Sequence, residues 1–521
     1  MKNTLIKISP PIWPIFEVEI EIIKKEIENN KAVTLITCDG EKDFCVANEK
    51  MSKLICLYCK KRLNDGLNFI GKFHKNQIHY INEKQINSFK KKQLDKIQNI
   101  KTKNDLLKIE FKKNDIGRSI LSTLVTQFNT ENIDITKYKP LIEEIYKQSI
   151  SALINFQKVL DKNKYNKILI FNGRIYNYRP LLRYSQKNKL NSYCYDYAYF
   201  SHKRYLVAKN DFTQNMFGRA IEIKKIALSR KLLLQKEIIK KSGISFFKSR
   251  INKKNTGPFA IFNAVQKDIL PKTFLTKNFN ISFFTSSDLE TSLITDMKKR
   301  FIYDNQIVAI KKILNKFKNK KINFYVRLHP NFSHDHKNTK NFMNLEKIFE
   351  NIEIIKPLSN VSTYKLAKTS DLVIAFGSTI GIESVFLKTN VINLGPSAYK
   401  EFKIDFQPNN HKETIDIILK LYKKNKFKNN SYHQSIIAAD AMSNQGKKLD
   451  YLHRVDALSS YYLINGKKYN LKKIDLIYIL FILYFIFSRF YKLIFLFFLN
   501  FDQFKFKLFN YIVRLKNIFK N

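Results

Sequence analysis

Residues 371–383 read DLVIAFGSTIGIE, and this stretch indicates the fold class. Asp371–Ala375 has the length and apolar character of a buried strand, Gly377–Thr379 forms a turn, and Gly381–Leu387 is expected to be a helix. Another apolar run, Asn390–Leu394, follows closely. A strand, a turn, a helix and a second strand joined by short connections predict a parallel sheet covered by helices.

The same alternation extends upstream through two regions of the chain. In the nearer region, the expected elements are Asn280–Phe284, Gln306–Phe317, Ile322–Val326, Ile352–Ile355 and Ser362–Thr369. In the region closer to the N-terminus, they are Phe16–Asn29, Ala32–Thr37, Leu141–Leu160, Lys167–Phe171, Leu181–Asn188 and Ser192–Tyr195. A polar segment at 249–258 separates the two regions. The fold class is therefore expected to be α/β, with two Rossmann-like domains and a cleft between them.

The length of 521 residues is too great for one hydrophobic core and fits two domains with additional segments. The N-terminal domain is expected to contain a cysteine cluster and a lysine-rich helical excursion. After the second domain, helices are expected to return to the body, followed by a basic, aromatic tail. The expected parts are the N-terminal domain (1–250), a linker (251–275), the second domain (276–430), the returning helices (431–470) and the tail (471–521).

The composition is strongly basic, since 93 Lys and Arg residues against 44 Asp and Glu residues give a formal net charge of +49. The lysines are spread along the whole chain with abundant Asn, Ile and Phe, as an AT-rich genome would produce. A nucleic-acid-binding protein would gather basic and aromatic residues on one face, so no nucleic-acid partner is expected. The charge does favour an anionic membrane leaflet. Residues 1–14 lack the pattern of a signal peptide, so the catalytic part is expected in the cytoplasm.

Polar side chains follow several of the expected strands of the second domain. They lie at Thr285–Asp288, Arg327–Pro330, Ser359 and Gly377–Thr379. Because ligands of doubly wound sheets bind beyond the carboxyl ends of the strands, we expect these clusters to converge on one rim. The turn Gly377–Thr379 also opens a helix, whose free N–H groups and dipole suit a phosphate.

These clusters supply the groups that a nucleotide sugar needs. Arg327 and His329 can donate to a diphosphate, and the hydroxyls of Ser378 and Thr379 can add hydrogen bonds. Glu383 lies one helical turn beyond Thr379 and can accept from ribose or sugar hydroxyls. A Ser-Thr pair before a helix is by itself most often an N-cap, but the combination of clusters on strand ends predicts a nucleotide-sugar site.

The run RLHP at 327–330, followed by VSTYKLAKTSDLVIAFGSTIGIE at 361–383, resembles the C-terminal domain of bacterial capsule polysaccharide biosynthesis glycosyltransferases. Related patterns occur in bacterial sialyltransferases, Kdo transferases and teichoic-acid glycerophosphotransferases. The resemblance covers residues 280–400 and implies the GT-B fold, which consists of two Rossmann-like domains with a cleft between them.

The resemblance also implies roles for individual residues. In such enzymes the His-Pro and Ser-Thr motifs grip the donor phosphate, which points to His329, Ser378 and Thr379. The glycerophosphotransferases usually carry Asp-Tyr-Ser-Ser, whereas residues 375–379 here read AFGST, which argues against that particular activity. In the N-terminal half, a fainter resemblance is carried by FNGR at 171–174 and by the clustered cysteines.

FNGR ends an expected strand of the first domain, so Asn172 and Arg174 are expected to face the cleft. Arg174 can meet the donor diphosphate or an anionic acceptor. The alternative is a strand-to-helix turn that needs Gly173 and is capped by Asn172. An inverting transferase also needs a carboxylate or His near the acceptor hydroxyl. Asp196, after a short strand, is the first candidate and Asp39 the second, unless each is merely a turn residue.

Four of the five cysteines, Cys38, Cys45, Cys56 and Cys59, are spaced as C-x6-C-x10-C-x2-C, and Cys194 stands alone. In a cytoplasmic protein this argues against a disulfide framework. Four thiolates within so short a stretch can bind zinc tetrahedrally, and a closed site of that kind is structural rather than catalytic. The alternative is a group of reduced core thiols.

The C-terminal tail is dense in aromatic and aliphatic residues between Leu476 and Leu499. Arg489 and Lys492 interrupt this stretch, and the uninterrupted part, Leu476–Phe487, is shorter than the roughly 20 residues that span a bilayer. Lysines flank the stretch on both sides. An interfacial anchor on the cytoplasmic leaflet fits best, with a tilted span or packing against the body as alternatives.

The sequence therefore predicts a metal-independent glycosyltransferase of the hexosyl or sialyl/Kdo type. It would move a sugar from a nucleotide donor in the second domain to a surface polysaccharide, of capsule or lipopolysaccharide type, or a lipid-linked glycan in the first. No DxD metal clamp stands out, so no catalytic cofactor is expected. The alternatives are a nucleotide-sugar epimerase of the same fold and, from another class, a basic zinc-containing nucleic-acid-binding protein.

Overall fold

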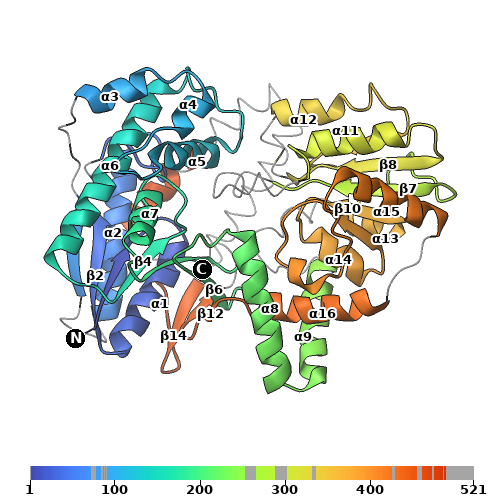
Figure 1. The fold of residues 1–521 in the computed structure, drawn as a ribbon. Coiled ribbons are helices and arrows are strands. Elements are labelled where there is room, and N and C mark those ends of the chain that lie inside the picture. The colour runs from blue at the N-terminus through green and yellow to red at the C-terminus, as the bar shows by residue number, and fades with distance from the viewer. Residues whose placement is uncertain are drawn as a thin grey trace. The chain divides into compact units, whose positions relative to one another are not determined.

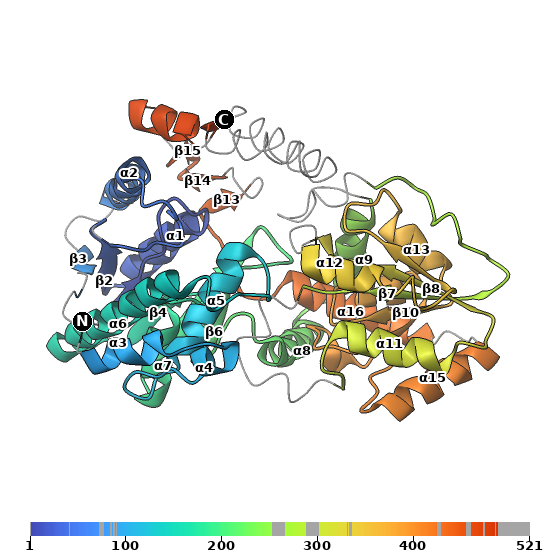
Figure 2. The same ribbon diagram turned by 90° about the horizontal axis from the view of Figure 1, so that it is seen from above.

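A computed structural model describes residues 2–487 with several gaps. The gaps are 41, 72–77, 84–85, 87–88, 90, 253–265, 288–301, 331, 333–335, 425–428, 455–459, 472–474 and 485. The chain forms two compact units. Unit 1 contains Met1–Thr213 and Gly446–Asn521, and unit 2 contains Gln214–Gln445. Figures 1 and 2 show their elements from two directions.

Unit 1 is built on a seven-stranded sheet in the order β12-β6-β5-β4-β1-β2-β3. Neighbours from β3 through β5 are parallel, whereas β6 is antiparallel to β5 and to β12. The strands are β1 (Lys2–Lys7), β2 (Lys31–Cys38), β3 (Ile78–Glu83), β4 (Lys167–Phe171), β5 (Ser192–Tyr197), β6 (Arg204–Lys209) and β12 (Lys447–Lys448).

Helices connect these strands and bury apolar stripes. In α1, residues Phe16, Ile20, Ile23 and Ile27 are all buried, as their helical spacing predicts. The helices of this part are α1 (Ile15–Glu28), α2 (Lys53–Gly71), α3 (Lys91–Gln98), α4 (Lys103–Leu107), α5 (Ile116–Phe128), α6 (Lys139–Lys162) and α7 (Arg179–Lys187). The lysine-rich excursion thus contains two short helices, α3 and α4.

The C-terminal part of unit 1 is a small antiparallel sheet of β13 (Leu452–Arg454), β14 (Ser460–Ile464) and β15 (Lys467–Tyr469). This corrects the expectation of returning helices over 431–470, because α16 (Asn429–Ser443) is the only helix among the described residues of that range. The physical reason is the turn between β14 and β15. Asn465 and Gly466 both adopt left-handed backbone angles, with φ of 49° and 74°, and an Asn-Gly pair in that conformation favours a tight hairpin.

Unit 2 is built on a five-stranded parallel sheet in the order β11-β10-β7-β8-β9. The strands are β7 (Phe279–Phe284), β8 (Ile322–Arg327), β9 (Ile352–Ile355), β10 (Leu372–Ala375) and β11 (Asn390–Asn393). The helices include α8 (Met216–Leu233), α9 (Lys236–Ile251), α11 (Gln306–Lys316), α12 (His336–Met343), α13 (Thr363–Thr369), α14 (Ile380–Phe386) and α15 (His411–Lys423).

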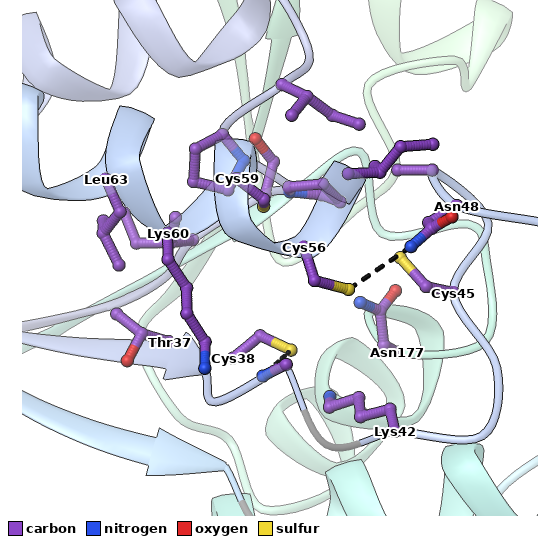
Figure 3. A pocket seen from close by; sticks show the side chains of 18 of the residues that line it. Thr37, Cys38, Lys42, Cys45, Asn48, Cys56, Cys59, Lys60, Leu63 and Asn177 are labelled. Carbon is purple, nitrogen blue, oxygen red and sulfur yellow. Dashed lines mark hydrogen bonds between the residues drawn. The ribbon is translucent and has the colours of Figure 1, made fainter. Parts of the chain in front are cut away.

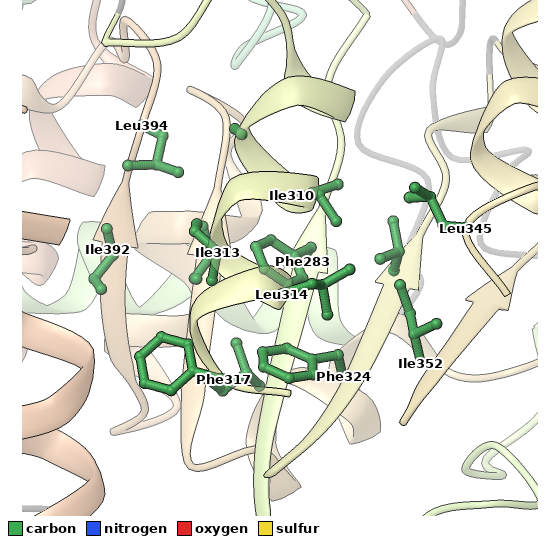
Figure 4. Packing of buried hydrophobic residues seen from close by; sticks show 14 of the residues in the cluster. Phe283, Ile310, Ile313, Leu314, Phe317, Phe324, Leu345, Ile352, Ile392 and Leu394 are labelled. Carbon is green, nitrogen blue, oxygen red and sulfur yellow. The ribbon is translucent and has the colours of Figure 1, made fainter. Parts of the chain in front are cut away.

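A hydrophobic core lies between this sheet and α11. Figure 4 shows Ile310, Ile313 and Leu314 of α11 next to Phe283 of β7 and Phe324 of β8, and all five side chains are buried. The i, i+3, i+4 spacing on α11 meets alternate residues of the strands, as expected where a helix covers a sheet.

The chain passes from unit 1 to unit 2 between Thr213 and Gln214, well before the boundary expected at residue 250. The cause is the packing of α8 and α9 on α16. Arg230 of α8 forms a bidentate pair with Asp440 of α16, at 2.6 and 2.8 Å. Gly243 lets α9 approach closely, since a Cβ there would lie 2.1 Å from the Ile436 carbonyl oxygen. Most of the expected linker lies outside the described residues.

The two sheets share one strand order. Read across each sheet from one edge, the order β3-β2-β1-β4-β5 in unit 1 corresponds to β9-β8-β7-β10-β11 in unit 2, and both match the Rossmann arrangement. The prediction of two Rossmann-like domains is therefore confirmed. Within the parts of the chain that the structure describes, no helix is long and apolar enough to cross a membrane. The tail beyond residue 487 lies outside those parts.

The face of α1 toward the sheet carries a buried carboxylate at Glu19. Its Oε1 accepts hydrogen bonds from the Tyr195 hydroxyl at 2.7 Å and from the Ser9 backbone N–H at 3.0 Å. Burial raises the pKa of Glu19 to about 7. The folded protein therefore holds this proton more tightly than the unfolded chain, and the stability of unit 1 should fall as pH rises from the unfolded pKa toward 7.

We predict that Glu19→Gln removes this pH dependence. The variant should gain stability relative to the parent between pH 5 and pH 8, by on the order of 3 kcal/mol at most, because each pKa unit corresponds to about 1.4 kcal/mol. Urea unfolding at the two pH values measures the gain. Glu237→Gln, on an exposed helix position, is the matched control and should show none. A Glu19→Gln effect of equal size at both pH values would contradict the prediction.

Candidate functional site

Three strands of unit 2 end side by side at the carboxyl edge of the sheet. In the pairing register, Phe284 of β7 lies beside Arg327 of β8 on one side and Ala375 of β10 on the other. The residues that follow these strands therefore begin at the same level. The order of strands also reverses between β7 and β10, which is where open α/β sheets form a ligand-binding crevice.

The segments after β7 and β8 are tied together by Thr285. Its backbone N–H donates to the Arg327 carbonyl oxygen at 3.1 Å, and its hydroxyl accepts from the His329 backbone N–H at 2.7 Å. Two of the clusters expected on this rim are thus in contact. Asp288, at the end of the first of them, lies outside the described residues.

Arg327 is a buried cation at this edge. Its side chain is 5% exposed, and Nη2 donates to the Ser359 carbonyl oxygen at 3.1 Å. Nη1 is buried without a hydrogen-bond partner, and no carboxylate of the described residues pairs with the guanidinium. Burial lowers the pKa of Arg327 to about 10, so it stays charged at neutral pH. A buried charge of this kind is costly without an anion beside it.

His329, two residues further on, is half-buried. Burial lowers the pKa of His329 to about 4, so its imidazole is neutral at pH 7. The ring can then offer one N–H to a phosphate oxygen but brings no charge. In this site the positive charge comes from Arg327 rather than from His329.

The turn after β10 depends on Gly377. Its φ is +82°, and a Cβ there would lie 2.3 Å from the Pro396 carbonyl oxygen, so only glycine fits. Ser378 is half-buried, and its carbonyl oxygen accepts from the Tyr399 hydroxyl at 2.9 Å. Thr379 occupies the N-cap position of α14 without a capping bond from its side chain. The simple capping role considered for this hydroxyl is therefore absent.

Arg250 of α9 holds the start of α14. Its Nη2 donates to the Thr379 hydroxyl at 3.1 Å, and its Nε lies 2.5 Å from Oε1 of Glu383, which is 2% exposed. The carboxylate expected to accept from ribose is thus bound to a cation of its own chain. Arg250 was not expected at this site. It stands 133 positions from Glu383, and nothing in the polar sequence around it signals the contact.

In unit 1, the structure brings Asn172 and Asp196 together. Asn172 follows β4 with φ of +57°, and its Nδ2 donates to Oδ2 of Asp196 at 2.8 Å. Asp196 also accepts from the Thr213 hydroxyl at 3.1 Å and from the Tyr197 N–H at 2.8 Å, and it is 4% exposed. Gly173 allows the turn, since a Cβ would lie 2.6 Å from Cys194 Sγ. These contacts fix the strand ends.

The other two predicted residues of unit 1 lie near the same sheet edge. Arg174 follows the turn after β4 and is 6% exposed. Asp39 follows β2 directly and is half-buried. The role of Arg174 toward a diphosphate or acceptor, and the assignment of Asp196 or Asp39 as the base, stay predictions.

Cys38, Cys45, Cys56 and Cys59 line one pocket of about 70 Å³ in unit 1, which Figure 3 shows. The Asn48 amide donates to Cys56 Sγ at 3.3 Å. Burial raises the pKa of Cys45 to about 11, and it raises that of Cys59 further. Among the described residues, no group of three or more His, Cys, Asp and Glu side chains is placed to hold a metal ion. The structural zinc site stays a prediction, which metal analysis of the purified protein tests.

Several solved structures are similar to this chain. Thermosulfurimonas dismutans KpsC, a beta Kdo 2,4 transferase, is 12% identical over 58% of this chain and 84% of that chain, with a TM-score of 0.33. UDP-GlcNAc 2-epimerase from Neisseria meningitidis is 10% identical over 85% and 97%, with a TM-score of 0.29. The spinosyn rhamnosyltransferase SpnG is 8% identical over 86% and 97%, with a TM-score of 0.25.

No protein-family model and no curated protein matches the sequence. Among the solved structures, those similar to this chain include Kdo transferases, one of the groups whose motifs the sequence resembles. Identities this low and TM-scores below 0.5 leave the activity to be argued from the site itself.

We predict that Arg250→Met destabilises unit 2 by roughly 3 kcal/mol, because it leaves Glu383 buried without its cation. The double variant Arg250→Met with Glu383→Leu should recover most of this loss, since both charges are then gone. Urea unfolding measures both. Arg183→Met, at a partly exposed position of unit 1, is the control for loss of an arginine. A double variant that is no more stable than Arg250→Met would show that the pair does not carry the effect.

Proposed function

We propose that the protein is a GT-B glycosyltransferase that moves a sugar from a nucleotide donor to a surface polysaccharide or a lipid-linked glycan. The observation that carries this proposal is Arg327. It is a buried cation without a carboxylate partner in the described residues, and it lies at the carboxyl edge of a Rossmann-like sheet. A guanidinium in that position suits the diphosphate of a nucleotide sugar.

The neighbouring groups complete a donor site of the same chemistry. The Gly377 turn brings backbone close to the rim, and the Ser378 hydroxyl has no hydrogen-bond partner among the described residues. The neutral His329 ring adds one N–H. In this proposal protein groups, chiefly Arg327, neutralise the charge of the diphosphate. Glu383 can bind the ribose only if its ion pair with Arg250 breaks.

A transferase is favoured over an epimerase by the pocket of unit 1. A transferase needs places for two substrates, whereas an epimerase rearranges one nucleotide sugar. The cysteine-lined pocket is a hollow at the carboxyl edge of the unit 1 sheet, separate in sequence from the residues around Arg327. This pocket can bind an acceptor separately from the donor site.

The activity is tested with a panel of UDP-, CMP-, CDP-, GDP- and dTDP-linked sugars. We expect one of them to raise the melting temperature, and the free nucleotide to be released only when acceptor glycan is present. Conversion of the nucleotide sugar to its epimer without acceptor would contradict the transferase and support the epimerase. Absence of stabilisation by every member of the panel would contradict the donor site.

We predict that His329→Ala lowers the transfer rate at least about tenfold, which corresponds to about 1.4 kcal/mol of transition-state stabilisation. The loss should be nearly independent of pH between 6 and 8, because the imidazole is neutral throughout that range. His433→Ala, at an exposed position of α16, is the matched control and should keep full activity. Full turnover by His329→Ala would exclude a phosphate role for this residue.

We also infer that the protein attaches peripherally to the cytoplasmic leaflet through its C-terminal segment. Residues 476–484 are helical and lie beside α2, where Phe481 stacks on Tyr58 with ring centres 4.1 Å apart (Figure 2). Asp475 pairs with Lys61 at 2.9 Å. One side of the segment is thereby fixed to unit 1.

The other side of this segment is an exposed apolar stripe. Its members repeat at intervals of three and four residues, and each is at least 42% exposed: Leu476, Ile479, Leu480, Leu483 and Phe487. Lys467 and Lys468 of the β14–β15 hairpin are exposed close by in the sequence. An apolar stripe with nearby lysines matches the acyl boundary and anionic headgroups of the inner leaflet.

We predict that Leu480→Glu combined with Leu483→Glu abolishes flotation with vesicles that contain phosphatidylglycerol. The substitutions place charges in the apolar stripe and leave the contact with Tyr58 intact. Leu232→Glu with Leu233→Glu, on the exposed end of α8, is the matched control and should still float. If the control is released and the tail variant is not, the membrane contact lies on α8 and the inference is wrong.

A further inference from the structure

The pocket of unit 1 lies where ligands of α/β sheets bind. It is lined by residues that follow β1, β2 and β4, among them Ser9, Gly40 and Asn177. The sheet order places β1 between β2 and β4, and the strand order reverses at β1 and β4. The pocket therefore occupies the crevice of the first Rossmann-like sheet. Its volume of about 70 Å³ has room for roughly five water molecules, or for a small charged group with part of a sugar ring.

The pocket carries excess positive charge. Lys7 and Lys42 both pair with Glu83, and the three side chains are 3%, 7% and 1% exposed. Burial raises the pKa of Glu83, but the two lysines outweigh this and lower it to about 2, so the carboxylate is ionised. Burial lowers the pKa of Lys7, whereas for Lys42 the charge of Glu83 outweighs burial and raises the pKa. Lys60 of α2 adds a third lysine, which has no ion-pair partner in the described part of the chain.

The remaining lining is neutral. No Asp or Glu side chain is among the described residues that line the pocket. The buried thiols of Cys45 and Cys59 stay protonated at neutral pH, because burial raises the pKa of each. Figure 3 shows the Lys60 side chain extending toward Cys38. Among the described residues, Glu83 is therefore the one carboxylate that pairs with these lysines.

Two further features restrict the chemical class of the ligand. Oδ1 of Asn177, a residue that is 6% exposed, is buried without a hydrogen-bond partner, so it calls for a donor such as a hydroxyl. The wall formed by Pro10, Pro11 and Leu63 is apolar and suits the C–H face of a sugar ring. The ligand thus needs an anionic group, a hydroxyl and a compact carbon body.

We propose that this pocket binds an acidic sugar, one that carries a carboxylate or a phosphate, and that this sugar belongs to the acceptor. Lys60 and the Lys7–Lys42 pair hold the anion, and Asn177 accepts from a neighbouring hydroxyl. The assignment to the acceptor rests on the proposed transferase function, whereas the binding of an acidic sugar does not.

The thiols provide a direct readout of occupancy. The full-length protein is treated at pH 8 with N-ethylmaleimide, and alkylation of Cys38 and Cys56 is followed by peptide mass spectrometry. Glucuronate or glucose 6-phosphate should slow this reaction in a saturable manner, whereas neutral glucose should not. The stronger of the two anions tells a carboxylate site from a phosphate site. Cys194, which is fully buried, is the internal control for unfolding.

Substitutions test the lysines. Lys60→Gln should weaken the protection by up to about fivefold in apparent Kd, the range expected for one solvent-accessible charge. Lys53→Gln, an exposed lysine of the same helix outside the pocket, should leave it unchanged. Equal protection by glucose, no protection by either anion, or equal losses in the two variants would overturn the proposal. The alkylation assay contains no nucleotide sugar, so it does not depend on transferase activity. If the acidic sugars protect the thiols but the protein shows no transferase activity, only the proposed function is contradicted.

Discussion

In each unit the first strand lies inside its sheet, with parallel neighbours on both sides, and this constraint determines where chemistry can occur. From β1 the chain builds outward to β3 and then returns to the other side as β4, and β7, β9 and β10 repeat the pattern. The connections leave the central strand in opposite directions, so the carboxyl edge opens between them. Thr285 and Arg327 border this opening in unit 2, and Ser9 and Asn177 border it in unit 1.

Both openings contain buried positive charge that the described residues do not neutralise. In unit 2 it is the guanidinium of Arg327. In unit 1 Lys7 and Lys42 share the single carboxylate of Glu83, and Lys60 adds a further lysine. Buried cations are stabilised by anions, so both sites favour ligands with phosphate or carboxylate groups. A reaction between a nucleotide sugar and an acidic acceptor uses both sites.

The sequence predicted the features that depend on local spacing. The alternation of Asp371–Ala375 with the following turn and helix indicated the second sheet, and the shared rim brought Thr285 beside His329 as expected. Long-range pairing was not predictable, because Arg250 reaches Glu383 only through the packing of α9. Two local signals were overlooked: Asn465-Gly466, which makes a hairpin where helices were expected, and Lys7, a lysine within an apolar strand.

The central claim is that the donor diphosphate binds at the carboxyl edge of β8 and β10. Hydrogen–deuterium exchange with and without the most stabilising nucleotide sugar of the panel tests this claim most directly. The account predicts slower exchange at the amides of residues 328–329 and 377–380, with the amides of α8 unchanged as an internal reference. Protection confined to other segments, or equal protection by a nucleoside that lacks phosphate, would contradict the account.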